Sequence, residues 1–280
     1  MRPHTRFQGL AHGLVYVGLV AAILAVALWR RERTDAPAPP PPLPGADKLP
    51  ISPSSPFSPT RMSAVTANVE TASGTAFSIS DAGVWLTARH TLEGCRQPAI
   101  VVAEGRGVAA RVRAVRGDIA VLTTQGGAPA LGLARLGQGT GDGQLTFLPG
   151  FPQGRPGEAA SRWLGVQSVR ARGRGQRPQV LLAWAEVGRT DGLTGTLAGL
   201  SGAPVLDGAG QVVGVALAWA PRRGRIFSST PEDLRAAVAA AGVGPVPTAP
   251  GETITPDNYG RVADSLRRDL SVAQVVCLAA

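Results

Sequence analysis

The sequence predicts a mostly β fold, on the basis of three observations. Nine short apolar runs, separated by Gly-rich turns, lie between residues 74 and 228. The chain contains 36 Gly and 24 Pro, a composition that favours short strands and turns over long helices. The segments between the runs lack helical periodicity, which argues against alternating strand and helix units. We therefore expect an antiparallel sandwich or a pair of barrels.

The expected strands are the apolar runs themselves, at residues 74–78, 84–88, 99–103, 108–115, 119–123, 145–148, 180–187, 212–219 and 225–228. A helix is expected after Thr230, a typical N-cap before Pro231, and Gly242 would end it. A second helix is expected from Thr255, because apolar residues recur after it at helical spacing. Residues 272–278 have the pattern of a last strand.

The N-terminal part of the chain is unlike the rest. Residues 7–29 contain no charged side chain and, at about 1.5 Å per residue, are long enough to span a bilayer as a helix. A cleaved signal peptide is the alternative, because Arg2 and Arg6 form a basic start and residues 25–27 offer an Ala-x-Ala site. The apolar run continues past this site into three arginines, which favours an uncleaved anchor. Charge does not decide its orientation, since the arginines on both sides nearly balance.

Four segments follow from these patterns. Residues 1–35 form the anchor or signal segment, and residues 36–62 form a Pro-rich linker suited to hold a domain away from a surface. Residues 63–248 form the main β domain. Residues 249–280 contribute a helix and a strand, which we expect to pack on that domain.

The net charge of +9 is spread along the chain and does not require a nucleic-acid partner. The densest basic stretch, residues 170–177, carries four arginines but no aromatic side chain that could stack on bases. We interpret it as a solvated loop and expect no nucleic-acid binding. Contact with an anionic surface or a nucleic acid is the alternative.

The two cysteines, Cys95 and Cys277, lie too far apart for a redox motif or for half of a zinc site. They either form a long-range disulfide or remain as two thiols. Export would favour the disulfide, because oxidising compartments preserve such bonds. We expect no metal site and no cofactor.

The candidate chemistry centres on one histidine and one serine. His4 and His12 lie in the N-terminal segment, so His90 is the only histidine of the β domain. Ser201 lies in a glycine-flanked turn between apolar segments. Such a turn can direct the N–H groups of Gly199 and Ser201 at one point, as a tetrahedral oxyanion requires. A structural histidine and a plain β-turn are the alternatives.

Three blocks of the sequence resemble those of the trypsin-like serine peptidases, and within them the bacterial Deg-type branch. The blocks are residues 87–90 (Thr-Ala-Arg-His), residues 118–122 (Asp-Ile-Ala-Val-Leu) and residues 199–205 (Gly-Leu-Ser-Gly-Ala-Pro-Val). They follow the family's order of histidine, aspartate and serine, within about residues 70–242. Residues 73–77 and 150–154 (Gly-Phe-Pro-Gln-Gly) are similar to two further segments of the family.

This resemblance implies two antiparallel β-barrels of chymotrypsin type and a serine endopeptidase. Ser201 would be the nucleophile, His90 its base, and Asp118 the acid that orients the imidazole. Asp191, ten residues before Ser201, is a rival for the acid, although the family places it in a structural loop. The N–H groups of Gly199 and Ser201 would form the oxyanion hole.

Three residues depart from the family's pattern. Leu200 replaces a polar Asp or Asn, Ala203 replaces a glycine, and Arg89 replaces a small residue. Leu200 cannot make the side-chain hydrogen bonds that often organise this loop, so we expect no activation through an ion pair there. None of the three removes a catalytic group. The alternative to an active enzyme is a degenerate, protease-like domain that binds extended peptides.

The expected substrate is a polypeptide that adds as a strand beside Ala216, Leu217 and Ala218. Gly195 and Thr196 would form the floor of the primary pocket, together with Leu197. No acid stands there to hold Lys or Arg. We therefore expect a preference for small or medium apolar residues.

The resemblance also bears on assembly and location. The segment after the β domain is too short for a PDZ domain, so the caged oligomers of the Deg type are not implied, and we expect a monomer. Our hypothesis is that a bond between Cys95 and Cys277 links the C-terminal segment to the loop behind His90. We expect an inner-membrane anchor with the domain in the periplasm or outside; secretion after cleavage is the alternative.

Overall fold

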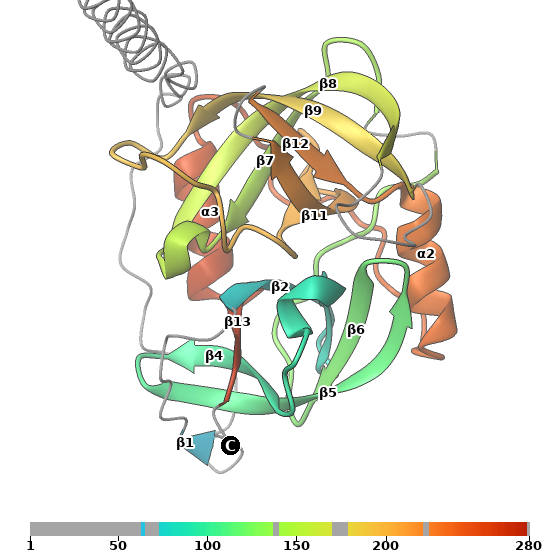
Figure 1. The fold of residues 1–280 in the computed structure, drawn as a ribbon, viewed down its shortest axis with the longest axis vertical. Coiled ribbons are helices and arrows are strands. Elements are labelled where there is room, and N and C mark those ends of the chain that lie inside the picture. The colour runs from blue at the N-terminus through green and yellow to red at the C-terminus, as the bar shows by residue number, and fades with distance from the viewer. Residues whose placement is uncertain (1–62, 65–72, 137–139, 170–178, 221–223, 279–280) are drawn as a thin grey trace, which may run out of the picture. The chain divides into compact units, whose positions relative to one another are not determined.

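The computed structural model describes residues 63–64, 73–136, 140–169, 179–220 and 224–278 (Figure 1). The predicted membrane segment, the Pro-rich linker and the basic stretch 170–177 lie outside the described residues. None of the helices within the described ranges is long and apolar enough to cross a membrane.

Six antiparallel strands close into a first barrel. They are β2 (Ser73–Ser80), β3 (Val84–Ala88), β4 (Pro98–Ala103), β5 (Arg106–Arg116), β6 (Ile119–Thr124) and β13 (Val272–Cys277). Their order is β5-β4-β13-β2-β3-β6, and pairing of β5 with β6 closes the ring. The two-residue strand β1 (Ser63–Ala64) pairs with β5 outside the ring. The C-terminal strand β13 therefore fills the place between β4 and β2 (Figure 1).

A second barrel has six further strands. They are β7 (Leu145–Gly150), β8 (Gly157–Val169), β9 (Gln179–Arg189), β10 (Pro204–Leu206), β11 (Val212–Ala220) and β12 (Arg225–Ser228). Their order is β10-β11-β12-β9-β8-β7, and β10 pairs with β7 to close the barrel. Two closed barrels confirm the predicted mostly β architecture and match the chymotrypsin type.

All nine predicted runs form strands, whereas β1, β8 and β10 were not predicted from the sequence. The first half of β8 is buried and includes small residues such as Ala159 and Ser161. In the second half, which contains Gly165, exposed and half-buried residues alternate. Neither half has the β-branched, apolar pattern that marks a strand. β10 has only three residues and is recognised through its pairing with β11 rather than through its composition.

Two α-helices follow the second barrel. α2 (Pro231–Ala240) is capped as predicted, because the Thr230 hydroxyl accepts a hydrogen bond from Asp233 N at 3.1 Å. α3 (Tyr259–Arg268) begins later than the predicted start at Thr255. The Asn258 side chain accepts from Thr255 N at 2.8 Å and holds the intervening residues in a turn. α2 contacts β5, β6 and β11, whereas α3 contacts β7, β8 and β13 (Figure 1).

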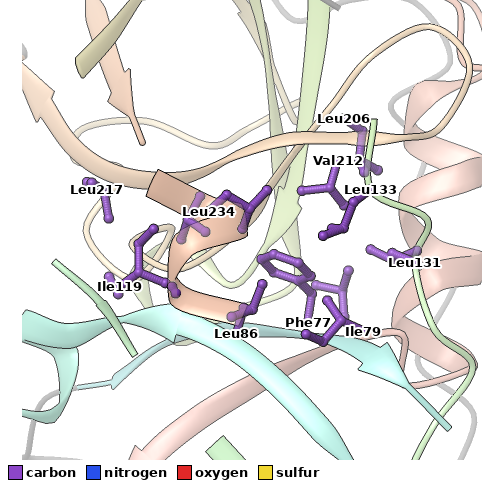
Figure 2. Close-up of a cluster of buried hydrophobic side chains, with 14 of the residues drawn as sticks. Phe77, Ile79, Leu86, Ile119, Leu131, Leu133, Leu206, Val212, Leu217 and Leu234 are labelled. Atoms are coloured by element: carbon purple, nitrogen blue, oxygen red, sulfur yellow. The ribbon is translucent and has the colours of Figure 1, made fainter. Parts of the chain in front are cut away.

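Each barrel has its own apolar interior, and a third cluster lies between them. Trp85 belongs to the interior of the first barrel and Trp184 to that of the second. The cluster between the barrels joins residues of both barrels to α2, including Phe77, Leu217 and Leu234 (Figure 2). The cluster includes Ala88 and Ile119, which lie at strand ends close to His90 and Asp118.

Candidate active site

His90 lies directly after β3, in the short 3-10 helix η2 (Arg89–Leu92). All five residues of β3 are buried, and His90 is the second residue after this strand. The Thr91 hydroxyl donates to Ala88 O at 2.6 Å and fixes the turn that follows. The His90 side chain remains 36% exposed and is accessible from solvent.

Asp118 lies in the turn between β5 and β6, where Gly117 has a φ of 58°. Pairing of β3 with β6 brings this turn beside His90. Asp118 Oδ2 lies 2.8 Å from His90 Nδ1, and Asp118 Oδ1 accepts from His90 N at 3.0 Å. Because an ionised carboxylate can only accept, Nδ1 carries the proton and Nε2 is left as the basic nitrogen.

The surroundings of Asp118 distinguish it from the rival acid. The carbonyl of Asp118 accepts a further hydrogen bond from Arg89 N at 2.8 Å, so the whole residue is held against η2. The Arg89 side chain lies 3.9 Å from Asp118 Oδ1 and 3.6 Å from Glu93, in an exposed position where such pairs contribute little. Asp191 lies in an exposed turn after β9, and no contact in the described part of the chain joins it to His90.

Ser201 lies in the turn between β9 and β10, and this turn reaches the first barrel. Its carbonyl oxygen accepts from Thr75 N in β2 at 2.8 Å. A Cβ placed on Gly74 would lie 3.0 Å from the same oxygen and 2.7 Å from Thr91, the neighbour of His90. Within the described residues, no hydrogen bond joins the Ser201 hydroxyl to His90; in active sites without substrate such bonds are often long.

Within the described residues, two N–H groups of the turn around Ser201 make no hydrogen bond. The N–H groups of Leu200 and Gly202 donate to backbone carbonyls, at 3.0 and 2.7 Å respectively. Among the described residues, no acceptor faces the N–H of Gly199 or of Ser201. These are the two donors that the sequence assigned to an oxyanion hole.

The peptide group between Ala198 and Gly199 has a fixed orientation. Its carbonyl accepts a hydrogen bond from Gln153 N at 2.5 Å. Because the C=O and N–H of a trans peptide point in opposite directions, the Gly199 N–H is directed away from Gln153. Gly199 has a φ of 94°, and a Cβ there would lie 2.4 Å from the Phe151 carbonyl oxygen. Only glycine fits this position.

Packing explains two of the three departures from the family's pattern, Leu200 and Ala203. Leu200 is buried in the interior of the second barrel, and a Cβ on Gly150 would lie 2.8 Å from its side chain. Apolar packing thus holds the loop where hydrogen bonds would otherwise do so. Ala203 is fully buried in the same cluster, so a methyl group is accommodated there. A methyl group does not fit at Gly202, because a Cβ there would lie 2.1 Å from the Thr75 carbonyl oxygen.

A cavity of about 170 Å³ opens beside Ser201. It is lined by Thr196, Leu197, Ala198, Leu200, Ser201, Ala216, Ala218, Trp219 and Ile226. Three of the predicted substrate-binding residues, Thr196, Ala216 and Ala218, belong to this lining. The lining contains no charged side chain.

Two residues predicted to bind substrate, Leu217 and Gly195, do not belong to the cavity lining. The Leu217 side chain is buried in the core between the barrels. The Gly195 carbonyl accepts from Arg189 Nη1 at 2.9 Å, and Arg189 Nε donates to Glu186 Oε1 at 2.6 Å. The other Glu186 oxygen accepts from the Trp219 indole at 3.1 Å. A buried, mutually neutralised ion pair therefore supports one wall of the cavity.

Several residues of the site were not identified from the sequence. Thr75 and Gln153 fall in segments that resemble the family, but their contacts with the serine turn depend on the fold. Trp219 and Ile226 have the pattern of ordinary strand residues. No local signal indicates which face of their strands opens onto the cavity.

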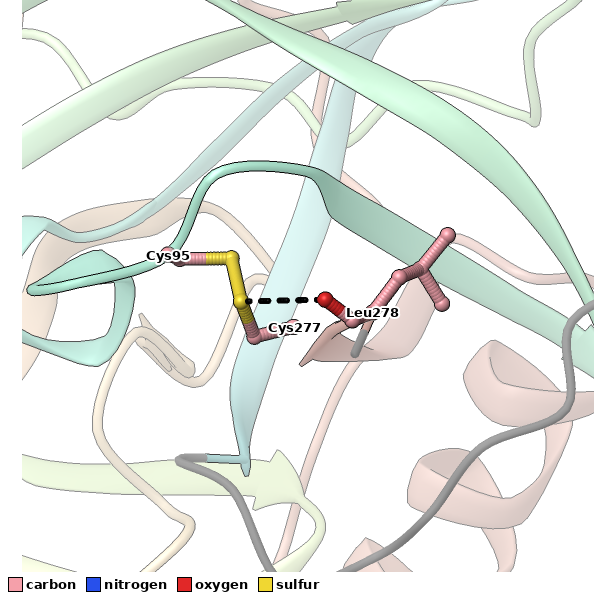
Figure 3. The surroundings of a disulfide bond; sticks show 3 residues. All are labelled: Cys95, Cys277 and Leu278. Carbon is pink, nitrogen blue, oxygen red and sulfur yellow. Dashed lines mark hydrogen bonds between the residues drawn. A yellow bond between two sulfur atoms is a disulfide. The ribbon is translucent and has the colours of Figure 1, made fainter. Parts of the chain in front are cut away.

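Two cysteines meet behind the histidine loop. Cys95, three residues after η2, forms a disulfide with Cys277 at the end of β13 (Figure 3). The carbonyl oxygen of Leu278 lies 3.8 Å from Cys277 Sγ. The bond connects the segment after His90 to the C-terminal strand.

Comparison with solved structures shows a shared fold. The Rv3671c protease from M. tuberculosis in its active form is 19% identical with a TM-score of 0.52, over 73% of this chain and 96% of that one. The HtrA-type protease AlgW, determined with a decapeptide, is 20% identical with a TM-score of 0.50, over 61% of this chain. The similarity spans about half of the AlgW chain, 52%.

Sequence comparison identifies a family. No curated protein matches the sequence. The trypsin-like peptidase domain matches residues 74–215, about half of the chain, a region that holds His90, Asp118 and Ser201. The chain belongs to the trypsin-like peptidase domain family.

Proposed function

We propose that this protein is a serine endopeptidase that cleaves polypeptides through Ser201, His90 and Asp118. The observation that carries the proposal is the pair of hydrogen bonds between His90 and Asp118, at 2.8 Å from the ring and 3.0 Å from the backbone. They hold the imidazole in the tautomer whose free nitrogen can take a proton from a serine hydroxyl.

The proposed reaction begins when Ser201 Oγ attacks the carbonyl carbon of the scissile bond and His90 Nε2 takes the hydroxyl proton. The carbonyl π electrons move onto the oxygen, where the N–H groups of Gly199 and Ser201 stabilise the negative charge. His90 then gives its proton to the leaving amine as the C–N bond breaks. An acyl-enzyme on Ser201 remains, and water activated by His90 hydrolyses it.

We propose a preference for small or medium apolar residues before the cleaved bond. The support is the uncharged lining of the cavity beside Ser201, to which Trp219 and Ile226 contribute bulk. The nearby charges of Glu186 and Arg189 are paired with each other and do not require a charged substrate. The substrate would lie beside Ala216 and Ala218.

The test is hydrolysis of peptide libraries by the full chain. We expect cleavage after Ala or Val in preference to Lys, Arg, Asp or Glu. Ser201→Ala should lower the rate by more than about 10³-fold, whereas Ser168→Ala, a change at an exposed serine of β8, should not. Binding of extended peptides by folded protein without cleavage would favour the degenerate, protease-like domain instead.

We also propose that residues 7–29 anchor the protein in the inner membrane, with the peptidase domain in the periplasm or outside. The uncharged length of this segment supports the proposal. The full chain should stay with the membrane fraction after an alkaline carbonate wash. Release as a soluble chain that begins near residue 28 would support the secreted alternative.

A further inference from the structure

Gln153 has an unusual backbone conformation. It forms the middle of the short turn η3 (Pro152–Gly154), with φ 54° and ψ 28°. This left-handed region is uncommon for residues other than glycine. Such a conformation persists where surrounding contacts hold it, and it is often associated with functional sites.

Three hydrogen bonds link Gln153 to the segment before Ser201. The side-chain Nε2 donates to Thr194 O at 2.7 Å and to Thr196 O at 2.8 Å. The backbone N–H donates to Ala198 O at 2.5 Å. An amide nitrogen has two hydrogens, so both side-chain donors are used. A single residue thus binds the carbonyls of three alternate residues in one loop.

This loop supplies the donor that the proposed reaction needs. The Ala198 carbonyl is held toward Gln153, so the N–H of the same peptide group, that of Gly199, is directed to the opposite side. If the loop turned this peptide over, the site would present a carbonyl oxygen where an oxyanion must bind. The hydrogen bonds from the Gln153 side chain to the carbonyls of Thr194 and Thr196 hold the loop beside Gln153. In this position of the loop, the Gly199 N–H keeps the orientation that the reaction needs.

We propose that Gln153 is a positioning residue for the oxyanion hole, acting through the carbonyls of Thr194, Thr196 and Ala198. The inference rests on the proposed peptidase function. A turn residue with only a structural role would change stability. A positioning residue should instead change kcat more than KM, because the oxyanion forms only in the transition state.

The test compares kcat and KM of Gln153→Glu and Gln153→Gly with those of the wild-type full chain on one cleaved peptide. A carboxylate cannot donate to the carbonyls and repels them, so Gln153→Glu should lower kcat about 100-fold, the effect of losing one oxyanion donor. Gln153→Gly suits the positive φ and keeps the backbone N–H, so a loss of about 10-fold is expected. KM should change less than threefold in both.

The matched control is Gln144→Glu, a glutamine before β7 whose side chain donates to Leu145 O at 3.2 Å. It should leave kcat within twofold of the wild type. The proposal is overturned if the wild type cleaves the peptide and both Gln153 variants keep kcat within threefold of it. It is also overturned if Gln144→Glu lowers kcat as much as Gln153→Glu does. If the wild type itself does not cleave the peptide, the proposed function is wrong, and this inference is wrong as well because it rests on that function. If Gln153→Glu does not fold, the result for Gln153→Gly decides alone.

Discussion

The Thr75 hydroxyl, in the first barrel, donates a hydrogen bond to the Gly199 carbonyl at 2.8 Å, two residues before Ser201. The same hydroxyl accepts from Phe151 N at 3.0 Å, and Thr75 is fully buried. One side chain of β2 therefore connects the serine turn with the turn that contains Gln153. Gly199, whose N–H is one of the two proposed oxyanion donors, is therefore held through both of its peptide groups, by Gln153 N at the Ala198 carbonyl and by Thr75 at its own carbonyl.

Thr75→Val should lower kcat by more than its loss of folding stability can explain. The change keeps the shape but removes the hydroxyl, which leaves Phe151 N and Gly199 O without their partner and costs about 1–3 kcal/mol of stability. We expect kcat to fall at least tenfold. The control is Thr124→Val at the far end of β6, where the hydroxyl accepts from Trp85 Nε1 at 2.9 Å. Chemical denaturation and peptide hydrolysis should show a similar stability loss there but an unchanged kcat; equal kcat for both variants would refute the role of Thr75.

Asp118→Asn should lower kcat by about 10⁴-fold, because an amide in this place favours the wrong imidazole tautomer. Asp191→Asn, at the rival acid, should leave kcat within threefold, since Asp191 lies in an exposed turn. Steady-state kinetics on the same peptide compare the two variants. A larger loss for Asp191→Asn than for Asp118→Asn would reverse the assignment of the acid.

The C-terminal helix is held by a buried cluster of charges. Arg267 is fully buried, donates to Gly157 O at 3.0 Å and pairs with Glu158 at 2.9 Å and with Asp264. Arg267→Met would leave two carboxylates without this guanidinium and should cost about 3–5 kcal/mol. Arg261, on the same helix, forms an exposed pair with Glu252, and Arg261→Met should barely shift the denaturation midpoint. Equal midpoints for the two variants would show that the cluster is not stabilising.

The disulfide should stabilise the first barrel, because it closes a loop of 182 residues in the unfolded chain. Loss of such a native bond typically costs about 2–5 kcal/mol. A reductant should therefore lower the thermal midpoint of the wild type but not that of Cys95→Ser/Cys277→Ser. Peptide maps with and without reduction provide the direct check. Two free thiols in protein purified without a reductant would contradict the pairing.

Much of the fold could be predicted because its signals are local. Apolar runs between Gly-rich turns marked nine strands, and the cap at Thr230 marked α2. The place of β13 could not be predicted. Its pairing of Gln274 with Thr75 joins residues about 200 positions apart, and no nearby pattern encodes which strands the chain end will meet. The start of α3 was placed too early because the Asn258 turn mimics the first turn of a helix.

The candidate site was predictable to a similar extent. His90, Asp118 and Ser201 lie in short blocks of recognisable pattern, so their candidacy is visible in the sequence. The bonds from Thr75 and Gln153 to the serine turn cross between distant segments, and their chemistry is ordinary for turns and strands. The substitution of leucine at position 200 is explained only by the apolar pocket that receives it.

In the proposed reaction, Ser201 is a nucleophile activated by His90. The most direct measurement is reaction of the folded full chain with a fluorophosphonate, followed by mass spectrometry of the peptides. We predict one adduct, on Ser201, that is absent in Ser201→Ala, strongly reduced in His90→Ala and unchanged in Ser168→Ala. Folded protein that takes up no probe, or an adduct on another serine, would show that Ser201 is not the activated nucleophile.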